Sequence, residues 1–342
     1  MNDRPVGIAV IGCGSTAHRR HLPVWRDLPG ARLVAVVSRD PTRRQEAAAQ
    51  YGALRALADW RELLTDASVE AVDVCTPHPQ HGEIAIAMAA AGKHVLCEKP
   101  LATDLPVAMA MVEAAKAAGV VLMPFLNMRL LGASATAIAL VRQGAIGEPQ
   151  ILRGVMAHGG PDRTDIRREW FWQASSGGGA ILDLGPHIFD LAAQIMPAPA
   201  SRIRATLRQP PGMAVESDGF VEIEYNDGSI AHMSLSWSLV AARESSLTVH
   251  GTTGSLRIQL LLAPDPAPNA PAAPLVLSSR RPGDPAVSYP TPATSTEPCS
   301  IFLQAVRGGD VSLSADAGLE VMRYISGCYR SHQHGSAWVS VK

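Results

Sequence analysis

The chain has 342 residues, a hydrophobic content of 47% and a formal net charge of -1. This composition is typical of a globular protein, and it excludes the basic excess expected of a protein that binds nucleic acid or an anionic membrane surface. The length is sufficient for two domains, each with its own hydrophobic core. Residues 1–5 lead directly into a strand pattern without the layout of a signal peptide, and no apolar run reaches membrane-spanning length, so we expect a cytoplasmic protein.

The five cysteines show no CxxC spacing, and the chain contains no HExxH pattern. Neither a disulfide framework nor a metal site is therefore predicted. Cys75 and Cys97 lie in apolar runs, and we interpret them as small buried side chains.

The first 125 residues alternate between apolar, strand-like runs and helical segments. Asp40 followed by Pro41 is typical of a helix start, because aspartate caps the first turn and proline fits the first helical position. The predicted strands span 6–11, 33–37, 69–75, 94–97 and 120–125, and the predicted helices begin near residues 15, 41, 81 and 105. Such alternation predicts an α/β domain with a doubly wound parallel sheet over residues 1–125.

The pattern changes after residue 125, where strands follow one another with turn-forming residues between them. The predicted strands are 151–156, 202–207, 220–225, 230–237, 246–250, 255–261 and 337–341, and the predicted helices are 133–143, 180–195 and 315–332. They indicate an α+β domain over residues 126–342, with an open, mostly antiparallel sheet and helices on one face. Residues 263–298 are rich in proline and alanine, and we interpret them as a long irregular connection.

A glycine-rich turn follows the first predicted strand. In Gly12-x-Gly14-x-x-Ala17 the first glycine suits a tight turn, the second lets a pyrophosphate approach the backbone, and the alanine permits close packing of helix on strand. The phosphate charge is then met by the free amides and the positive end of the helix that begins at Ser15 and Thr16. A glycine turn after a strand is common, but the order strand, turn, helix and strand predicts a dinucleotide-binding site.

The residue that ends the second strand bears on the form of the dinucleotide. Sites specific for NAD usually carry an acid there, which binds the ribose 2'-hydroxyl. Ser38 occupies this position, with Arg39 next and Arg43 and Arg44 one helical turn further. A hydroxyl and guanidinium groups suit a 2'-phosphate, so NADP(H) is favoured. NAD(H) is the alternative, because Asp40 can bind the ribose instead of capping the helix.

Lys99 follows the fourth predicted strand and precedes Pro100. The chain has 26 arginines but only four lysines, and lysine, unlike arginine, can lose its proton in a partly buried site. The proline favours an extended conformation of Lys99 at the carboxyl end of the strand, where ligands of open α/β sheets bind. A solvated lysine after a strand is the alternative interpretation.

A second candidate group lies in the predicted helix 180–195. Asp183 and His187 are four residues apart, so in a helix their side chains share one face and can reach one ligand. Pro186 is expected to loosen or kink this helix, and the glycines at 177–179 would let backbone and ligand approach closely. An ordinary surface pair or a satisfied core pair is the alternative.

Several of these motifs, taken together, resemble the glucose-fructose oxidoreductase / inositol dehydrogenase / rhizopine-catabolism (Gfo/Idh/MocA) family. They occur in order along nearly the whole chain: Gly12-Cys13-Gly14, Thr76-Pro77 with His81, Glu98-Lys99-Pro100, the glycines 177–179 with Asp183 and His187, and the turn 249–255. The resemblance implies a Rossmann domain, an α+β domain whose open sheet often mediates oligomerisation, and reversible hydride transfer between a nicotinamide cofactor and a hydroxyl of a sugar, sugar derivative or cyclitol. A homodimer or homotetramer is therefore expected.

The resemblance also implies roles for single residues. Lys99 would lie beside the nicotinamide, and Asp183 and His187 would contact substrate hydroxyls. Hydride removal from a carbinol carbon requires loss of the hydroxyl proton, so His187 is the predicted acid/base, Lys99 polarises the oxygen, and Asp183 orients the two. Glu98 is expected to position Lys99 or the cofactor ribose. The predicted cofactor-binding residues are Gly12, Gly14, Ser15, Thr16, Ala17, Ser38, Arg39, Arg43, Thr76, Pro77, His81, Glu98 and Lys99, and the further expected substrate contacts are Asn127, Arg129 and Trp172.

Two other functions fit the same resemblance. One is a glycosidase that uses tightly held NAD for transient oxidation, and the other is a regulator that binds a dinucleotide without catalysis. The presence of Lys99, Asp183 and His187 argues against the regulator.

Overall fold

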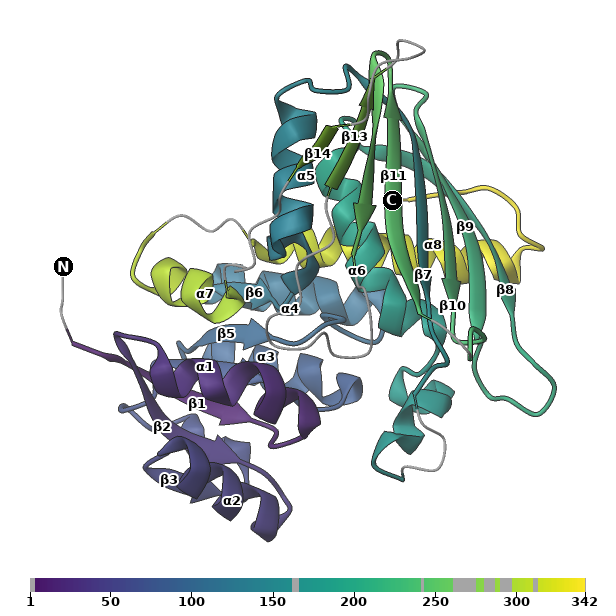
Figure 1. Ribbon diagram of the computed structural model, residues 1–342. Coiled ribbons are helices and arrows are strands. Elements are labelled where there is room, and N and C mark those ends of the chain that lie inside the picture. The colour runs from purple at the N-terminus through teal and green to yellow at the C-terminus, as the bar shows by residue number, and fades with distance from the viewer. Residues whose placement is uncertain are drawn as a thin grey trace. The chain divides into compact units, whose positions relative to one another are not determined.

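In the computed structural model of the protein, the first part of the chain forms a six-stranded parallel sheet with the order β3-β2-β1-β4-β5-β6 (Figure 1). Its strands are β1 (Val6–Ile11), β2 (Ala31–Val37), β3 (Arg55–Leu57), β4 (Ala71–Val74), β5 (His94–Cys97) and β6 (Leu122–Pro124). All residues of β1 and β4 are buried, as expected of strands covered on both faces. The sequence did not predict β3, a short edge strand that offers no run of buried apolar residues.

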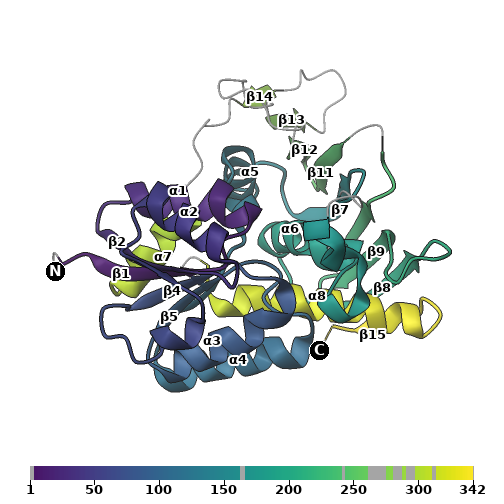
Figure 2. The same cartoon turned by 90° about the horizontal axis from the view of Figure 1, so that it is seen from below.

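Helices cover both faces of this sheet. Figure 2 shows α1 (Leu22–Asp27) and α2 (Pro41–Tyr51) on one face and α3 (His81–Ala90) and α4 (Leu105–Ala118) on the other. The doubly wound prediction is therefore confirmed. The shorter helical segments are the π-helical η1 (Ala17–His21) and the 3-10 turns η2 (Trp60–Leu63) and η3 (His78–Gln80).

The second sheet has nine strands in the order β14-β13-β12-β11-β7-β10-β9-β8-β15. Its strands are β7 (Pro149–Ala157), β8 (Ala200–Arg208), β9 (Asp218–Tyr225), β10 (Ile230–Ser236), β11 (Glu244–Gly251), β12 (Gly254–Gln259), β13 (Leu275–Ser279), β14 (Val287–Tyr289) and β15 (Val339–Ser340). Among the described strands of this second sheet, only β7 and β10 pair in parallel, so the sheet is mostly antiparallel, as predicted.

Three longer helices accompany this sheet: α5 (Gly132–Arg142), α6 (Ala180–Ile195) and α8 (Ala315–Gln333). The 3-10 turns are η4 (Asn127–Leu130), η5 (Ile166–Trp172) and η6 (Ala174–Ser176). α5 and α6 lie on one face of the sheet (Figure 1). α6 approaches closely because β7 carries Gly154, where a side chain would begin 2.5 Å from the Cδ1 atom of Ile188.

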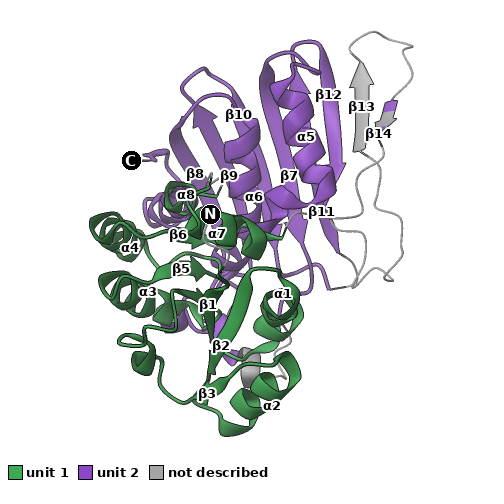
Figure 3. Ribbon diagram, turned by 90° about the vertical axis from the view of Figure 1, so that its left-hand side faces the viewer, with its two compact units in different colours: residues 1–126, 296–319 green, residues 127–295, 320–342 purple. Residues whose placement is uncertain are grey.

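The structure describes residues 4–161, 166–240, 243–260, 275–279, 287–289, 297–309 and 313–341. Two compact units are distinguished in Figure 3: residues 1–126 with 296–319, and residues 127–295 with 320–342. The segment 296–319, which carries α7 (Pro298–Val306), was expected in the second domain but belongs to the first unit. It does so because Phe302 is fully buried there and its ring packs against Trp25.

The interpretation of 263–298 as irregular throughout was wrong in part, because β13 and β14 extend the second sheet there and Pro298 begins α7. Backbone pairing with β12 stabilises β13, whose short apolar run lies within a proline-rich stretch. The rest of that stretch lies outside the described residues. No helix in the described parts of the chain is long and apolar enough to cross a membrane.

A buried ion pair joins η4 to α6. The Nε atom of Arg129 donates a hydrogen bond to Oδ2 of Asp190 at 2.8 Å, and its Nη2 atom donates to Oδ1. The exposed fractions of the two side chains are 8% and 1%, so neither charge has water as an alternative partner. The buried carboxylate of Asp190 therefore depends on the guanidinium of Arg129 for its counter-charge.

Replacing Arg129 with methionine should lower the free energy of unfolding by about 3 to 5 kcal/mol, because Asp190 would be left buried without its counter-charge. Urea denaturation followed by circular dichroism measures this loss. The double variant Arg129→Met/Asp190→Leu should recover most of it, because no buried charge then remains. A loss of less than about 1 kcal/mol in the single variant, the range of exposed ion pairs, would contradict this account.

Candidate functional site

The turn after β1 has the shape that a dinucleotide fold requires. Gly12 has a φ of +105°, and a side chain there would begin 2.6 Å from the carbonyl oxygen of Cys75. Gly14, in contrast, has no atom of another described residue within 4 Å of where its side chain would begin, its direct chain neighbours aside. Ala17 is fully buried under the helical segment that follows. Gly12 is thus needed for the turn itself, whereas Gly14 leaves open space beside the backbone.

The end of β2 places polar groups beside this turn. Asp40 caps α2, because its Oδ1 atom accepts hydrogen bonds from the amides of Thr42 and Arg43, and its Oδ2 atom lies 3.2 Å from Nε of Arg43. Arg44 donates to the carbonyl of Ser38. Among the described residues, the guanidinium group of Arg39 has no hydrogen-bond partner. The carboxylate of Asp40 is thus engaged in capping the helix.

The loop after β4 is fastened to the loop after β5 by His81. This side chain is fully buried, and its Nδ1 and Nε2 atoms each lie 2.9 Å from a carbonyl oxygen, those of Pro100 and Thr76 respectively. Burial lowers the pKa of His81, and a neutral ring donates to only one of these carbonyls. The hydroxyl of Thr76 has no hydrogen-bond partner among the described groups, and Pro77 beside it is exposed.

Lys99 lies at the carboxyl end of β5, as predicted, and its side chain is partly exposed. Glu98 before it is 8% exposed, and its Oε2 atom accepts a hydrogen bond from the backbone amide of Lys99 at 2.8 Å. Of the two roles expected for Glu98, this contact favours the positioning of Lys99.

A buried histidine that the sequence analysis did not single out supports Glu98 from behind. The Nε2 atom of His21 lies 3.0 Å from Oε1 of Glu98, and its Nδ1 atom lies 2.8 Å from Oδ2 of Asp73, which also accepts a hydrogen bond from the indole of Trp25. Burial by itself lowers the pKa of His21, but the charges of both carboxylates and the hydrogen bonds to them raise it to about 10. Burial raises the pKa of Glu98, but His21 and Lys99 together lower it to about 2.

Cys299 lies beside the same group. Its thiol, a ring nitrogen of His21 and a carboxylate oxygen of Asp73 are potential metal ligands, and these atoms lie within 4.8 Å of one another. An imidazolium that donates from both ring nitrogens has no lone pair for a metal ion. The cluster is therefore best described as a buried charge network.

In the second unit, α6 presents Asp183 and His187 as predicted. Both side chains are half-buried, whereas every other residue from 180 to 192 is buried. α6 is continuous through Pro186. The indole Nε1 of Trp237 donates to Oδ2 of Asp183 at 3.3 Å. The helix therefore holds the acid and the imidazole on one face, four residues apart.

The glycines before α6 make room for protein groups. Glu216 is 7% exposed, and its Oε1 atom accepts hydrogen bonds from the amide of Ile181 and the hydroxyl of Tyr329, both at 3.0 Å. Gly179 has a φ of +114°, and a side chain there would begin 2.4 Å from Oε1 of Glu216. A side chain at Gly178 would likewise meet the carbonyl oxygen of Phe171. The space that the sequence predicted for a ligand beside these glycines is thus occupied by Glu216 and by the backbone of Phe171.

Aromatic rings gather beside Asp183. The ring of Trp237 lies 4.9 Å from that of Trp172 and 6.3 Å from that of Phe171, between centroids. Trp172 was predicted to line the substrate site, whereas Trp237 was not, because an apolar residue at the end of a strand carries no functional signal of its own. The contact between Trp237 and Asp183 cannot be predicted from the sequence, because it depends on the packing of β10 against α6.

Two other expected substrate contacts lie at the start of the second unit. Asn127 begins η4 and is half-buried. Arg129 is committed to its ion pair with Asp190 and is nearly buried. Its guanidinium thus joins η4 to α6, and contact of either residue with a substrate stays a prediction.

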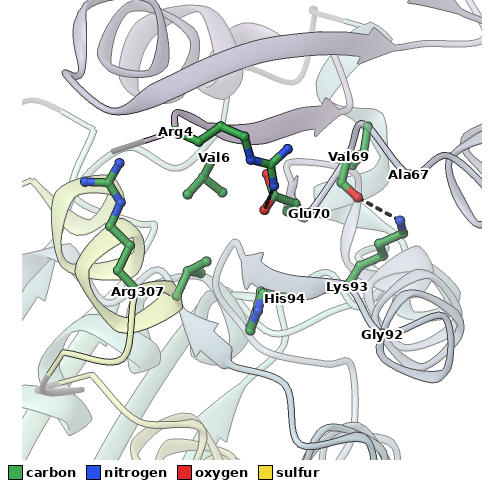
Figure 4. A pocket seen from close by; sticks show the side chains of 10 residues that line it. Arg4, Val6, Ala67, Val69, Glu70, Gly92, Lys93, His94 and Arg307 are labelled. Carbon is green, nitrogen blue, oxygen red and sulfur yellow. Dashed lines mark hydrogen bonds and ion pairs between the residues drawn. The ribbon is translucent and has the colours of Figure 1, made fainter. Parts of the chain in front are cut away.

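A cavity of about 500 Å³ lies at the opposite edge of the first sheet (Figure 4). Its lining includes His94, the first residue of β5, and Glu70, directly before β4. Its charges are engaged: Arg4 donates to Glu70 at 2.7 Å, and Lys93 donates to the carbonyl of Val69 at 2.7 Å. The cavity lies at the edge where the parallel strands begin, whereas the turn after β1 and Lys99 lie at the edge where the strands end.

Comparison with known proteins identifies related chains. Residues 6–126 match the GFO_IDH_MocA model, described as an oxidoreductase family with an NAD-binding Rossmann fold, and residues 134–257 match the GFO/IDH/MocA C-terminal domain. A dTDP-3,4-didehydro-2,6-dideoxy-alpha-D-glucose 3-reductase of Saccharopolyspora spinosa is 30% identical over 261 residues, which are 76% of each chain. A levoglucosan dehydrogenase of Pseudarthrobacter phenanthrenivorans is 35% identical over 170 residues, which are 49% of this chain but only 43% of that protein.

The solved structure of a levoglucosan dehydrogenase in complex with NADH and levoglucosan has the same fold. Its TM-score is 0.85 at 24% identity, and the match covers 99% of this chain and 100% of that one. At this identity the likeness concerns the fold alone.

The two glycines of the turn should respond differently to alanine. Gly12→Ala should lower the thermal unfolding midpoint by several degrees, because it strains a positive φ and meets the carbonyl of Cys75. Gly14→Ala should leave the midpoint unchanged but weaken binding of a nicotinamide dinucleotide by about tenfold or more, because the methyl group fills the open space. Differential scanning fluorimetry and fluorescence titration measure the two effects. Unchanged nucleotide affinity in Gly14→Ala would refute the site.

Proposed function

The chain belongs to the Gfo/Idh/MocA family of oxidoreductases, and we propose that it transfers a hydride between a nicotinamide dinucleotide and a hydroxyl-bearing carbon of a sugar, sugar derivative or cyclitol. The nicotinamide, when bound, supplies the hydride acceptor or donor. The protein supplies the binding site and the groups that move the hydroxyl proton.

The observation that carries this proposal is the carboxyl edge of the first sheet. β1, β4 and β5 are neighbours and run parallel, so the turn at Gly14, the loop at Thr76 and the lysine at position 99 lie at one edge. Dinucleotides bind at this edge of a doubly wound sheet. The open space at Gly14 and the hydroxyl of Thr76, which has no hydrogen-bond partner in the part of the chain that the structure describes, support a dinucleotide there.

We assign Lys99, His187 and Asp183 to catalysis. The ammonium of Lys99 polarises the reacting oxygen, and the imidazole of His187 takes up or returns the hydroxyl proton. Asp183 orients the substrate hydroxyl, and Trp237 holds this carboxylate by its indole hydrogen bond. These assignments rest on family membership.

A sugar or cyclitol suits the chemistry beside Asp183. Carboxylate and imidazole groups bind hydroxyls, and the half-buried ring of Trp172, which packs against the buried ring of Trp237, offers apolar surface to the C–H groups of a sugar. The S. spinosa and P. phenanthrenivorans relatives are named for sugar substrates. A substrate panel of levoglucosan, L-sorbose, D-glucose and myo-inositol, read by nicotinamide absorbance with NADP⁺ and NAD⁺, tests the class. A glycosidase would release product without net absorbance change, and a regulator would give neither signal.

Lys99→Met should lower turnover by about a hundredfold or more while nucleotide affinity stays near that of the parent, because the side chain keeps its bulk and loses its charge. His187→Ala should lower turnover similarly and flatten its pH dependence between about pH 6 and 8. Initial rates with the best sugar of the panel, together with nucleotide titration, measure these effects. Parent-like turnover in Lys99→Met would remove the catalytic assignment.

The proposed cofactor preference is NADP(H), with NAD(H) as the alternative. It is supported by the hydroxyl of Ser38, by the free guanidinium of Arg39 among the described residues, and by the engagement of Asp40 in the helix cap. Ser38→Asp should therefore reverse or abolish the preference through repulsion of the 2'-phosphate. Titration of parent and variant with both dinucleotides measures it, with Ser38→Ala as the uncharged control. Equal or tighter binding of NAD(H) by the parent would count against NADP(H).

We propose a homodimer or homotetramer formed through the sheet face that α5 and α6 leave uncovered. Phe220 on that face is 61% exposed and Ile151 is 37% exposed, and an ion pair between Arg204 and Glu222 lies beside them. Burial against a second copy would remove this apolar surface from water. Light scattering at micromolar concentration should show the oligomer, and Phe220→Glu should shift it toward monomer without lowering the stability of the subunit. A monomeric parent protein would contradict the proposal.

A further inference from the structure

His21 is a fully buried titratable side chain to which the proposed reaction gives no part. It ends η1, directly downstream of the glycine turn, and its ring packs on Phe125 with centroids 4.1 Å apart. Its two nitrogens face carboxylate oxygens of Asp73 on β4 and Glu98 at the end of β5. An imidazole that bonds two carboxylates must donate from both nitrogens, which only the charged imidazolium can do.

Glu98 connects this imidazolium to Lys99. Its Oε1 atom receives the hydrogen bond from His21, and its Oε2 atom receives the bond from the backbone amide of Lys99. The carboxylate is therefore held at both oxygens and has no freedom to rotate. On the other side of Lys99, the Nδ1 atom of His81 lies 2.9 Å from the carbonyl of Pro100. The backbone amide of Lys99 is thus held by Glu98, and the next carbonyl, that of Pro100, lies within hydrogen-bond distance of His81.

We propose that His21 is a positioning residue for hydride transfer, which acts through Glu98 on the backbone of Lys99. The inference rests on the proposed catalytic role of Lys99. Because a displacement of about 1 Å in a catalytic group can lower a rate about a hundredfold, loss of the imidazolium should affect turnover strongly. Nucleotide affinity should change less, because the turn at Gly14 lies outside the contacts of His21.

Two substitutions of His21 separate its two hydrogen bonds. In His21→Gln the amide nitrogen can occupy the position of Nε2 and still donate to Glu98, whereas in His21→Asn it can occupy that of Nδ1 and donate to Asp73 instead. We expect His21→Asn to lower kcat by about 10- to 100-fold and His21→Gln to lower it by only a few-fold, with a small change in KM for the dinucleotide. If His21 had only a structural role, the loss of kcat in each variant would follow the fall in its thermal unfolding midpoint. His21→Asn would then not be slower than His21→Gln at equal stability.

The pH profile supplies a second readout. Among the described residues, the carboxylates of Asp73 and Glu98 and the thiol of Cys299 face His21, and Glu297 interacts with the charge of His21. Without the imidazolium, the burial of Glu98 should raise its pKa above about 2, because one of the two groups that lower this pKa is then missing. The ratio of variant to parent turnover should therefore fall as the pH decreases from about 7 to 5, because protonation of Glu98 changes its contact with Lys99.

Glu297→Gln is the matched control, because the charge of His21 affects Glu297 but no hydrogen bond joins these two described side chains. Its turnover ratio should be independent of pH. Rates are measured with the best sugar of the panel over this pH range, on variants whose folding is checked by circular dichroism.

Glu98→Gln tests the same connection while His21 is retained. This variant provides the test if His21→Asn does not fold. It should lower kcat as His21→Asn does, and the double variant His21→Gln/Glu98→Gln should be no slower than Glu98→Gln alone. Parent-like kcat and a flat turnover ratio in His21→Asn and Glu98→Gln would overturn the inference while a slow Lys99→Met kept the proposed function. Parent-like turnover in Lys99→Met would instead overturn both.

Discussion

The parallel register of β4, β1 and β5 is the constraint on which the candidate site of the first unit depends. Residues 11, 74 and 97 are aligned across these strands, so the loops that follow them emerge together. Strands buried on both faces hold this register, because a shift by one residue would exchange side chains between the two helical layers. Gly12, Thr76 and Lys99 therefore share one edge through backbone geometry, independently of any contact among their side chains.

Buried charge is used in both units to fix elements that carry proposed site residues. In the first, an imidazolium between two carboxylates fixes Glu98, and in the second a guanidinium–carboxylate pair fixes η4 to α6. Such groups contribute little net stability compared with apolar packing, but a misplaced element would leave a charge buried without a partner. That penalty favours one arrangement over near alternatives and so defines the position of Lys99 and of the helix that carries Asp183.

Much of the fold follows from local patterns. The helices at 105–118 and 180–195 have the predicted bounds, because proline at the first turn begins the former and a dense apolar face defines the latter. β1 and β5 also agree, since short runs of buried apolar residues between turns are typical of parallel strands. β3 and β13 were missed because their stability comes from pairing with a neighbouring strand rather than from their own residues.

The sequence by itself determined the order of the elements, the glycine turn, and the spacing of Asp183 and His187 on one helix face, because these depend on residues close together in the chain. Only the tertiary structure decided that His21 meets Glu98 across 77 positions and that Trp237 meets Asp183 across 54. It also decided that the glycines before α6 admit Glu216. Such contacts depend on which strands become neighbours, and that choice is made by the packing of the whole core rather than by any local run of residues.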